Sequence, residues 1–262
     1  MIGYKTGNEL DSKSQFGILI GGGGGVLSEY GTEQVGISAE IAIASLTGVT
    51  VDQAYKGRGR SDLIKHLTPS LAFAVGQIPT PIEHVAEGQN AVDFLLEGGK
   101  TLSVKSNMRE LGKAAPQNIG QPTSATFWER LPFLVPDGVA INSLSYSESA
   151  KVFKQVAQSN TAALLAEYWK NLFDCDYLLY VYNVLGQDNE LSASTQVLIY
   201  EKSESPQWDE SKISFTRTLL EWNESCTVRY GEISIAEFQV HSHRNCFKFR
   251  FNLGGLIRAG LL

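Results

Sequence analysis

The spacing of hydrophobic and polar positions changes along the chain. Up to about residue 173, apolar positions recur mostly at the three- and four-residue intervals of a helix, and later they alternate as in strands. The pattern predicts a helix over 38–47 that ends at Gly48, a short helix up to Leu67, one within 117–131, and two within 147–173. The proline-containing stretch 68–82 is expected to be irregular.

Strand-like alternation is found in two parts of the sequence. A hairpin is predicted from strands over 91–96 and 101–107 with a turn at 97–100, and later strands over 177–185, 192–200, 212–218, 226–229, 233–241 and 246–251. These elements indicate an α/β (α+β) fold in which helices flank one large mixed β-sheet. A single domain, 1–262, is expected, with a core over about 35–185 and a β-rich C-terminal part over about 186–262. The glycine run 21–25 lacks the ending of a phosphate-binding loop and is interpreted as a turn.

Composition places the chain among ordinary globular proteins, because 43% of its residues are hydrophobic and 19% are charged. No apolar stretch reaches the roughly 18 residues of a membrane span, and residues 1–15 lack the features of a secretory signal. We therefore expect a cytoplasmic protein without a membrane partner. The three cysteines are widely spaced, which predicts reduced and mostly buried thiols.

The net charge of −6 argues mildly against nucleic-acid binding, but the charges are unevenly distributed. Residues 238–262 contain no acidic side chain, and residues 100–114 contain four basic side chains against one glutamate. Local basic faces on an acidic body suit an enzyme that binds a duplex and also carries carboxylates for a metal.

The segment with the clearest chemistry is the predicted hairpin. Asp93 lies in its first strand and Lys105 in its second, where alternation puts Thr101, Ser103 and Lys105 on one face. Either charge is costly to bury unless it is paired with the other or with a metal. One interpretation is a buried Asp–Lys ion pair. The other is a phosphodiesterase site, in which Asp93 and the Val104 carbonyl bind Mg²⁺ and Lys105 orients or deprotonates the attacking water.

An aspartate, a short hairpin and then a lysine on the second strand resemble the PD-(D/E)xK nuclease superfamily, and "TLSVKSN…APQNIGQP" resembles its type II restriction endonucleases. The resemblance covers about residues 35–135. It implies a restriction-endonuclease-like core and Mg²⁺-dependent cleavage of double-stranded DNA at a specific sequence, as in restriction–modification. It also implies 5′-phosphate ends and Mn²⁺ as a substitute metal.

The resemblance assigns Asp93 to the first acidic position of the motif and Lys105 to its lysine, but Ser103 stands where the second acid is expected. A hydroxyl is a poor replacement for a carboxylate as a metal ligand. Glu40, in the apolar helix 37–46, is the favoured replacement, and Glu110 is the alternative, in a segment that reads as an exposed loop. Gln117 and Gln121 are expected to hold the water or the scissile phosphate. The alternative is that they are ordinary polar residues of a loop or a helix cap.

Candidate DNA contacts lie in three segments. A basic, glycine-punctuated loop at 56–60 could follow phosphates or simply be solvated, and the polar row around the turn at 242–245 offers side chains that read base edges. The residues assigned to DNA binding are Lys56, Arg58, Arg60, Asn107, Gln117, Gln239, His241, His243, Arg244, Asn245, Lys248 and Arg250. His241 and His243 as a metal-chelating pair is the less favoured interpretation.

Two other functions are kept beside the restriction endonuclease. One is a structure-specific repair or junction nuclease, and the other is an inactive DNA-binding module, which the serine at position 103 favours. A homodimer is expected because palindromic sites imply two-fold symmetry, with a monomer as the alternative.

Overall fold

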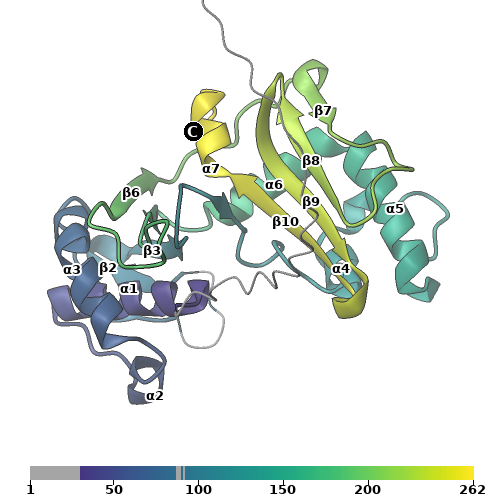
Figure 1. The fold of residues 1–262 in the computed structure, drawn as a ribbon. Coiled ribbons are helices and arrows are strands. Elements are labelled where there is room, and N and C mark those ends of the chain that lie inside the picture. The colour runs from purple at the N-terminus through teal and green to yellow at the C-terminus, as the bar shows by residue number, and fades with distance from the viewer. Residues whose placement is uncertain (1–29, 87–89, 91) are drawn as a thin grey trace, which may run out of the picture.

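The computed structural model describes residues 30–86, 90 and 92–262, and its strands form two five-stranded sheets (Figure 1). The first sheet has the order β1-β2-β3-β5-β6, with bounds β1 Pro81–His84, β2 Phe94–Leu96, β3 Lys100–Ser106, β5 Tyr177–Tyr182 and β6 Gln196–Glu201. Strands β3 and β5 are parallel, and the other neighbours are antiparallel. This sheet is therefore mixed, as predicted.

The second sheet is antiparallel throughout and has the order β4-β10-β9-β8-β7. Its bounds are β4 Lys113–Ala114, β7 Ile213–Phe215, β8 Ser225–Tyr230, β9 Ile233–His241 and β10 Cys246–Asn252. Helices α4 Ser124–Arg130, α5 Tyr146–Ser159 and α6 Thr161–Leu172 lie behind this sheet in the view of Figure 1, and α7 Leu253–Arg258 follows β10. Short 3-10 turns are Glu97–Gly99, Pro132–Leu134, Ile141–Ser143, Glu210–Lys212 and Ser242–Arg244.

The first sheet is covered by α1 Thr32–Thr47 and α3 Ser61–Val75, while the short α2 Gln53–Lys56 connects them. Helix α1 ends where Gly48 adopts a left-handed φ of 75°, as the sequence predicted. Helix α3 continues through Pro69 to Val75, so the expected irregularity of 68–82 is wrong, and β1 occupies the end of that stretch. Buried Leu63, Leu67 and Leu71 keep one face of α3 in the core, which outweighs the backbone hydrogen bond that proline removes.

The predicted α/β (α+β) fold class is confirmed, but the strands form two sheets where one large mixed sheet was expected. A parallel pair needs a long crossover, and the crossover from β3 to β5 contains β4 and α4–α6. That crossover contributes the edge strand and the covering helices of the second sheet, while β6, beyond residue 185, returns to the first sheet. The expected boundary at residue 185, between a core and a C-terminal part, stays a prediction. The two sheets do not divide there, since β4 belongs to the second sheet and β6 to the first.

The remaining predicted elements are largely confirmed. The two helices within 147–173 are α5 and α6, separated at Asn160, and α5 begins with a capping box between Ser145 and Glu148. The predicted strands match β2, β3 and β5–β10 within a few residues. Cys175, Cys226 and Cys246 are buried free thiols. The turn at 21–25 and position 91 of the predicted hairpin lie outside the described residues.

In the described part of the chain, no helix combines the length and the apolar character that crossing a membrane requires.

The core under the second sheet is an aromatic cluster, and we expect Phe153 to be essential to its stability. Phe153 is fully buried on α5 and stacks on Phe247 of β10 with ring centroids 4.2 Å apart. Phe153→Ala should lower the free energy of unfolding by about 3–5 kcal/mol in denaturant titrations, since it leaves a cavity. Phe133→Ala is the matched control, because Phe133 is 61% exposed. An equal loss in both variants would contradict this packing.

Candidate active site

Asp93 is held immediately before β2 by backbone and side-chain hydrogen bonds. Its N–H donates to the carbonyl of Leu102 at 2.8 Å, and its own carbonyl accepts from Val85 at 2.9 Å. The carboxylate Oδ2 accepts the N–H of Val104 at 2.5 Å and the hydroxyl of Ser103 at 3.2 Å. Among the described residues, both hydrogen bonds to the carboxylate of Asp93 end on Oδ2. The adjacent strand thus fixes a carboxylate that is only 8% exposed.

Nearby positive charge does not fully compensate the buried carboxylate of Asp93, and the pKa of Asp93 is raised. Burial raises the pKa of Asp93, and the negative charge of Glu40 raises it further. Lys105 and the hydrogen bonds from Val104 and Ser103 lower the pKa, but the balance remains above the ordinary value. A bound cation would relieve this strain on the charged form.

Glu40 projects from the buried side of α1 and is only 6% exposed. Its Oε2 accepts hydrogen bonds from the hydroxyl of Tyr55 at 2.5 Å and from Nε2 of His84 at 3.0 Å. Nδ1 of His84 is buried and has no hydrogen-bond partner among the described residues. The sequence reasoning did not find Tyr55 or His84, although a histidine in a short strand beside Asp93 was a usable signal.

The two candidate second carboxylates lie in different surroundings. Glu40 is close enough to Asp93 to influence its pKa, whereas Glu110 lies exposed in the loop between β3 and β4. Ser103 is 2% exposed and acts as a hydrogen-bond donor to Asp93. The structure therefore brings Glu40 to Asp93 and gives Ser103 a supporting contact.

Lys105 does not form the simple buried ion pair with Asp93 that was one of the two interpretations. Its Nζ donates to Oε1 of Gln117 at 2.9 Å, and the ion pairs of the described residues include none between Lys105 and Asp93. Lys105 and Gln117 line a cavity of about 290 Å³ with Gln121, Lys113 and Tyr180. The lysine, both predicted glutamines and a further lysine thus share one open pocket.

The predicted basic loop carries its own counter-charges. Lys56 is exposed at the end of α2, Arg58 pairs with Glu33 at 2.5 Å, and Arg60 pairs with Asp62 at 2.9 Å. Asn107 braces its loop, since its side chain donates to the carbonyl of Glu110 at 3.0 Å. Their roles in DNA binding stay predictions.

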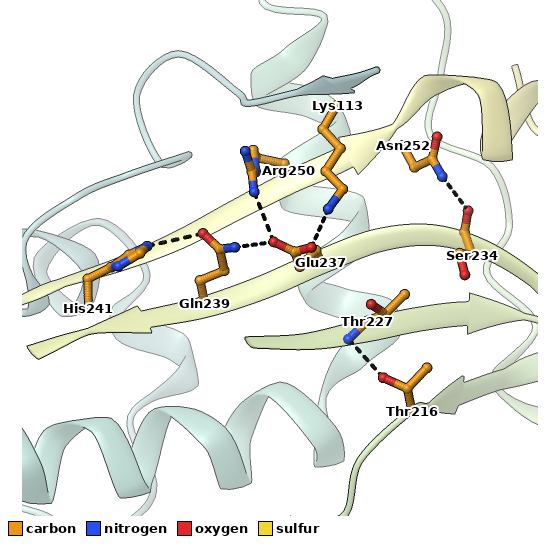
Figure 2. A network of polar contacts seen from close by, with 9 residues as sticks. All are labelled: Lys113, Thr216, Thr227, Ser234, Glu237, Gln239, His241, Arg250 and Asn252. Carbon is orange, nitrogen blue, oxygen red and sulfur yellow. Dashed lines mark hydrogen bonds and ion pairs between the residues drawn. The ribbon is translucent and has the colours of Figure 1, made fainter. Parts of the chain in front are cut away.

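The predicted polar row around 242–245 lies at the end of the β9–β10 hairpin. His243, Arg244 and Asn245 are exposed in its turn, where Asn245 adopts a left-handed φ of 47°. Nε2 of His241 bonds to Gln239 at 3.0 Å. Figure 2 shows this contact leading through Gln239 to Glu237, which the sequence reasoning missed. The sequence did mark Glu237, because it is the last acidic residue before the acid-free stretch 238–262.

The donor set around Asp93 fits a hard cation such as Mg²⁺. Carboxylate and carbonyl oxygens are the ligands that Mg²⁺ prefers, and it is usually held by one or two carboxylates with several waters. Asp93 and Glu40 supply two carboxylates on fixed elements, and Lys105 lies on the strand that anchors Asp93. Among the described residues, no group of three or more His, Cys, Asp or Glu side chains is arranged to hold a metal.

The raised pKa of Asp93 predicts a pH-dependent cost in the metal-free protein. Because the folded state holds the proton more tightly than the unfolded chain, stability falls as pH rises from the ordinary carboxyl range through the raised pKa. Asp93→Asn should therefore raise the unfolding temperature in EDTA near neutral pH, by roughly 2–4 °C for each kcal/mol gained.

The matched control for this stability prediction is Asp176→Asn. A hydrogen bond from Lys100 lowers the pKa of Asp176, so removal of its charge should lower the unfolding temperature or leave it unchanged. A lower unfolding temperature for Asp93→Asn would mean that the buried charge is already well compensated.

Comparison with known proteins finds a relative named "Type II restriction enzyme CviAII", from Paramecium bursaria Chlorella virus 1. The two sequences are 31% identical over 232 residues, which is 87% of this chain and 59% of that protein. The chain therefore spans less than two thirds of the relative's length. No protein-family profile matches the chain. No solved structure matches it either.

Proposed function

We propose that this protein is a type II restriction endonuclease that hydrolyses phosphodiester bonds of double-stranded DNA at a specific sequence, uses Mg²⁺ and leaves 5′-phosphate ends. The observation that carries the proposal is the buried Asp93 carboxylate, anchored by β3, with Lys105 on that strand and Glu40 in electrostatic reach. The similarity to a protein named as a type II restriction enzyme supports the same activity.

Asp93 and Glu40 would hold the metal through carboxylate oxygens, and the Val104 carbonyl would add a backbone oxygen. When bound, Mg²⁺ would act as a Lewis acid on the phosphoryl oxygens and lower the pKa of a coordinated water. Tyr55 and His84 keep Glu40 in one orientation by hydrogen bonding to its Oε2.

Lys105 orients or deprotonates the attacking water in this proposal, and its positive charge favours the negative charge that develops on the phosphoryl oxygens. Gln117 keeps the ammonium in place through its Oε1. Gln121 and Lys113 line the same pocket, and in this proposal they donate hydrogen bonds to a phosphate oxygen. In-line attack of this water on phosphorus would break the bond to the 3′ oxygen, which takes up a proton and leaves as a 3′-hydroxyl, so that the phosphate stays on the 5′ end.

A site-specific endonuclease must also cleave both strands of the duplex. Because palindromic sites carry two-fold symmetry, the proposal includes a homodimer, with sequential nicking by a monomer as the alternative. A structure-specific repair or junction nuclease would use the same residues, and cleavage only of branched or damaged DNA would favour it. The serine at position 103 favours an inactive DNA-binding module, which would bind duplexes and never cut them.

Asp93→Ala should abolish Mg²⁺-dependent cleavage, and Lys105→Ala should lower kcat by about 100- to 1000-fold, as for loss of one transition-state donor. The assay is single-turnover cleavage of a plasmid that the unaltered protein cuts into discrete bands. Lys151→Ala, which removes an exposed charge from α5, is the control and should cut at the normal rate. Substantial cleavage by either site variant would refute the assignment.

The second carboxylate is tested by comparing Glu40→Gln with Glu110→Gln, which make the same chemical change in a buried and an exposed residue. Glu40→Gln should raise the Mg²⁺ concentration for half-maximal cleavage by at least about tenfold. Glu110→Gln should leave it unchanged. The reverse result would move the ligand to the loop after β3.

A further inference from the structure

The two faces of the second sheet differ sharply in chemistry. On β9 and β10, Phe238, Phe249 and Phe251 point into the aromatic core and are fully buried. The alternate positions form the opposite face, where cross-strand pairing sets Glu237 opposite Arg250 and Gln239 opposite Lys248. The phenylalanine face packs against residues of α4–α6, so this row of hydrogen-bonding side chains lies on the face away from those helices.

Glu237 is the centre of the contacts on this polar face, as Figure 2 shows. Its side chain is 11% exposed and receives Arg250 Nη2 at 2.9 Å, the ammonium of Lys113, and the amide of Gln239. Burial raises the pKa of Glu237, but the hydrogen bonds from Lys113 and Arg250 outweigh burial and keep the pKa below its usual range. One ionised carboxylate therefore fixes three side chains.

The positive charges on this face exceed what Glu237 can neutralise. Lys248 forms no ion pair or hydrogen bond with the described residues. Burial lowers the pKa of Lys248, and the positive charges of Arg250 and Arg244 lower it further. Among the described residues, the buried Nε of Arg250 has no hydrogen-bond partner. A buried donor without a partner costs free energy.

Lys113 joins this face to the candidate active site. It lines the pocket that contains Lys105 and Gln117, and it also binds Glu237. Its strand β4 pairs with β10, with Lys113 opposite Asn252. The polar row on β9 and β10 thus leads directly to the pocket where the scissile phosphate is proposed to bind.

We propose that this face of β9 and β10 reads base edges in the major groove, and that Glu237 is a positioning residue that aims Arg250 at a base and Lys113 at the adjacent backbone. The inference rests on the proposed function and deepens it. A two-stranded ribbon fits the major groove, where Arg recognises guanine by a two-pronged contact, Gln recognises adenine and Lys recognises guanine. Glu237 acts through the residues it holds.

The test measures sequence preference by the whole protein without cleavage. The protein is incubated with duplexes that have a randomised central segment, with Ca²⁺ in place of Mg²⁺, and the bound DNA is sequenced. Arg250→Lys keeps the charge and loses the fork of the guanidinium. It should lower the preference for the selected base at one position by about 10- to 100-fold, while affinity for unselected DNA changes less than about threefold.

Glu237→Gln keeps the size of the side chain and removes its charge, so it should weaken preference at the same base position that Arg250→Lys affects. A merely structural role would lower the unfolding temperature and reduce binding to all sequences alike. The control is Lys151→Ala, which changes an exposed residue of α5, a helix that lies behind the second sheet in Figure 1, and it should keep the normal preference.

The outcomes separate this inference from the proposed function. Selection of one sequence that Arg250→Lys leaves intact overturns the inference, even if cleavage occurs. If the protein selects one sequence and Arg250→Lys lowers the preference at one position, the inference is supported. This holds even if the protein never cuts DNA, and then only the proposed cleavage fails. If the unaltered protein binds duplexes without preferring any sequence, the inference is overturned.

Discussion

The candidate site depends on the contact between β3 and the carboxylate of Asp93. A buried carboxylate is tolerated only with compensation, and here the N–H of Val104 and the hydroxyl of Ser103 supply part of it. Because both bonds come from the strand that carries Lys105, one hydrogen-bonded unit fixes the carboxylate and the lysine relative to each other. The remaining deficit of positive charge is visible as a raised pKa of Asp93, and a bound cation would relieve it.

Among the described residues, Glu237 is buried as Asp93 and Glu40 are, but its surroundings differ from those of Asp93. Glu237 has Lys113 and Arg250 as direct partners, and its pKa is lowered. Asp93 has Lys105 only at a distance, because the lysine bonds to Gln117, and its pKa is raised. The first arrangement is suited to holding side chains in position, and the second is suited to receiving a ligand. Lys113 pairs with Glu237 and also lines the pocket that contains Lys105 and Gln117.

Local patterns predicted most elements, since periodicity and capping act within a few residues. The hairpin that joins Asp93 to β3, the break between α5 and α6 and the turn at Gly48 all follow from such signals. The continuation of α3 through Pro69 did not, because long-range burial of its leucines decides it. The division into two sheets also depends on pairings between distant strands, such as β4 with β10.

The site was predictable to the same extent. Asp93, Ser103 and Lys105 were found because they share one hairpin, and Glu40 because it is an isolated charge in an apolar helix. Tyr55 and His84, which hold Glu40, and Glu237, which holds Lys113, come from segments that only the folded chain brings together. Sequence proximity therefore revealed the candidate catalytic groups, and tertiary contacts revealed the residues that hold them.

The proposed function requires this site to cut DNA at a defined sequence. The most direct measurement is to incubate the protein with a long DNA of known sequence and Mg²⁺ and to sequence the ends of all products. The account predicts discrete fragments whose ends share one short sequence and carry 5′-phosphates. DNA that stays intact with both Mg²⁺ and Mn²⁺, or ends scattered without a common sequence, would contradict it.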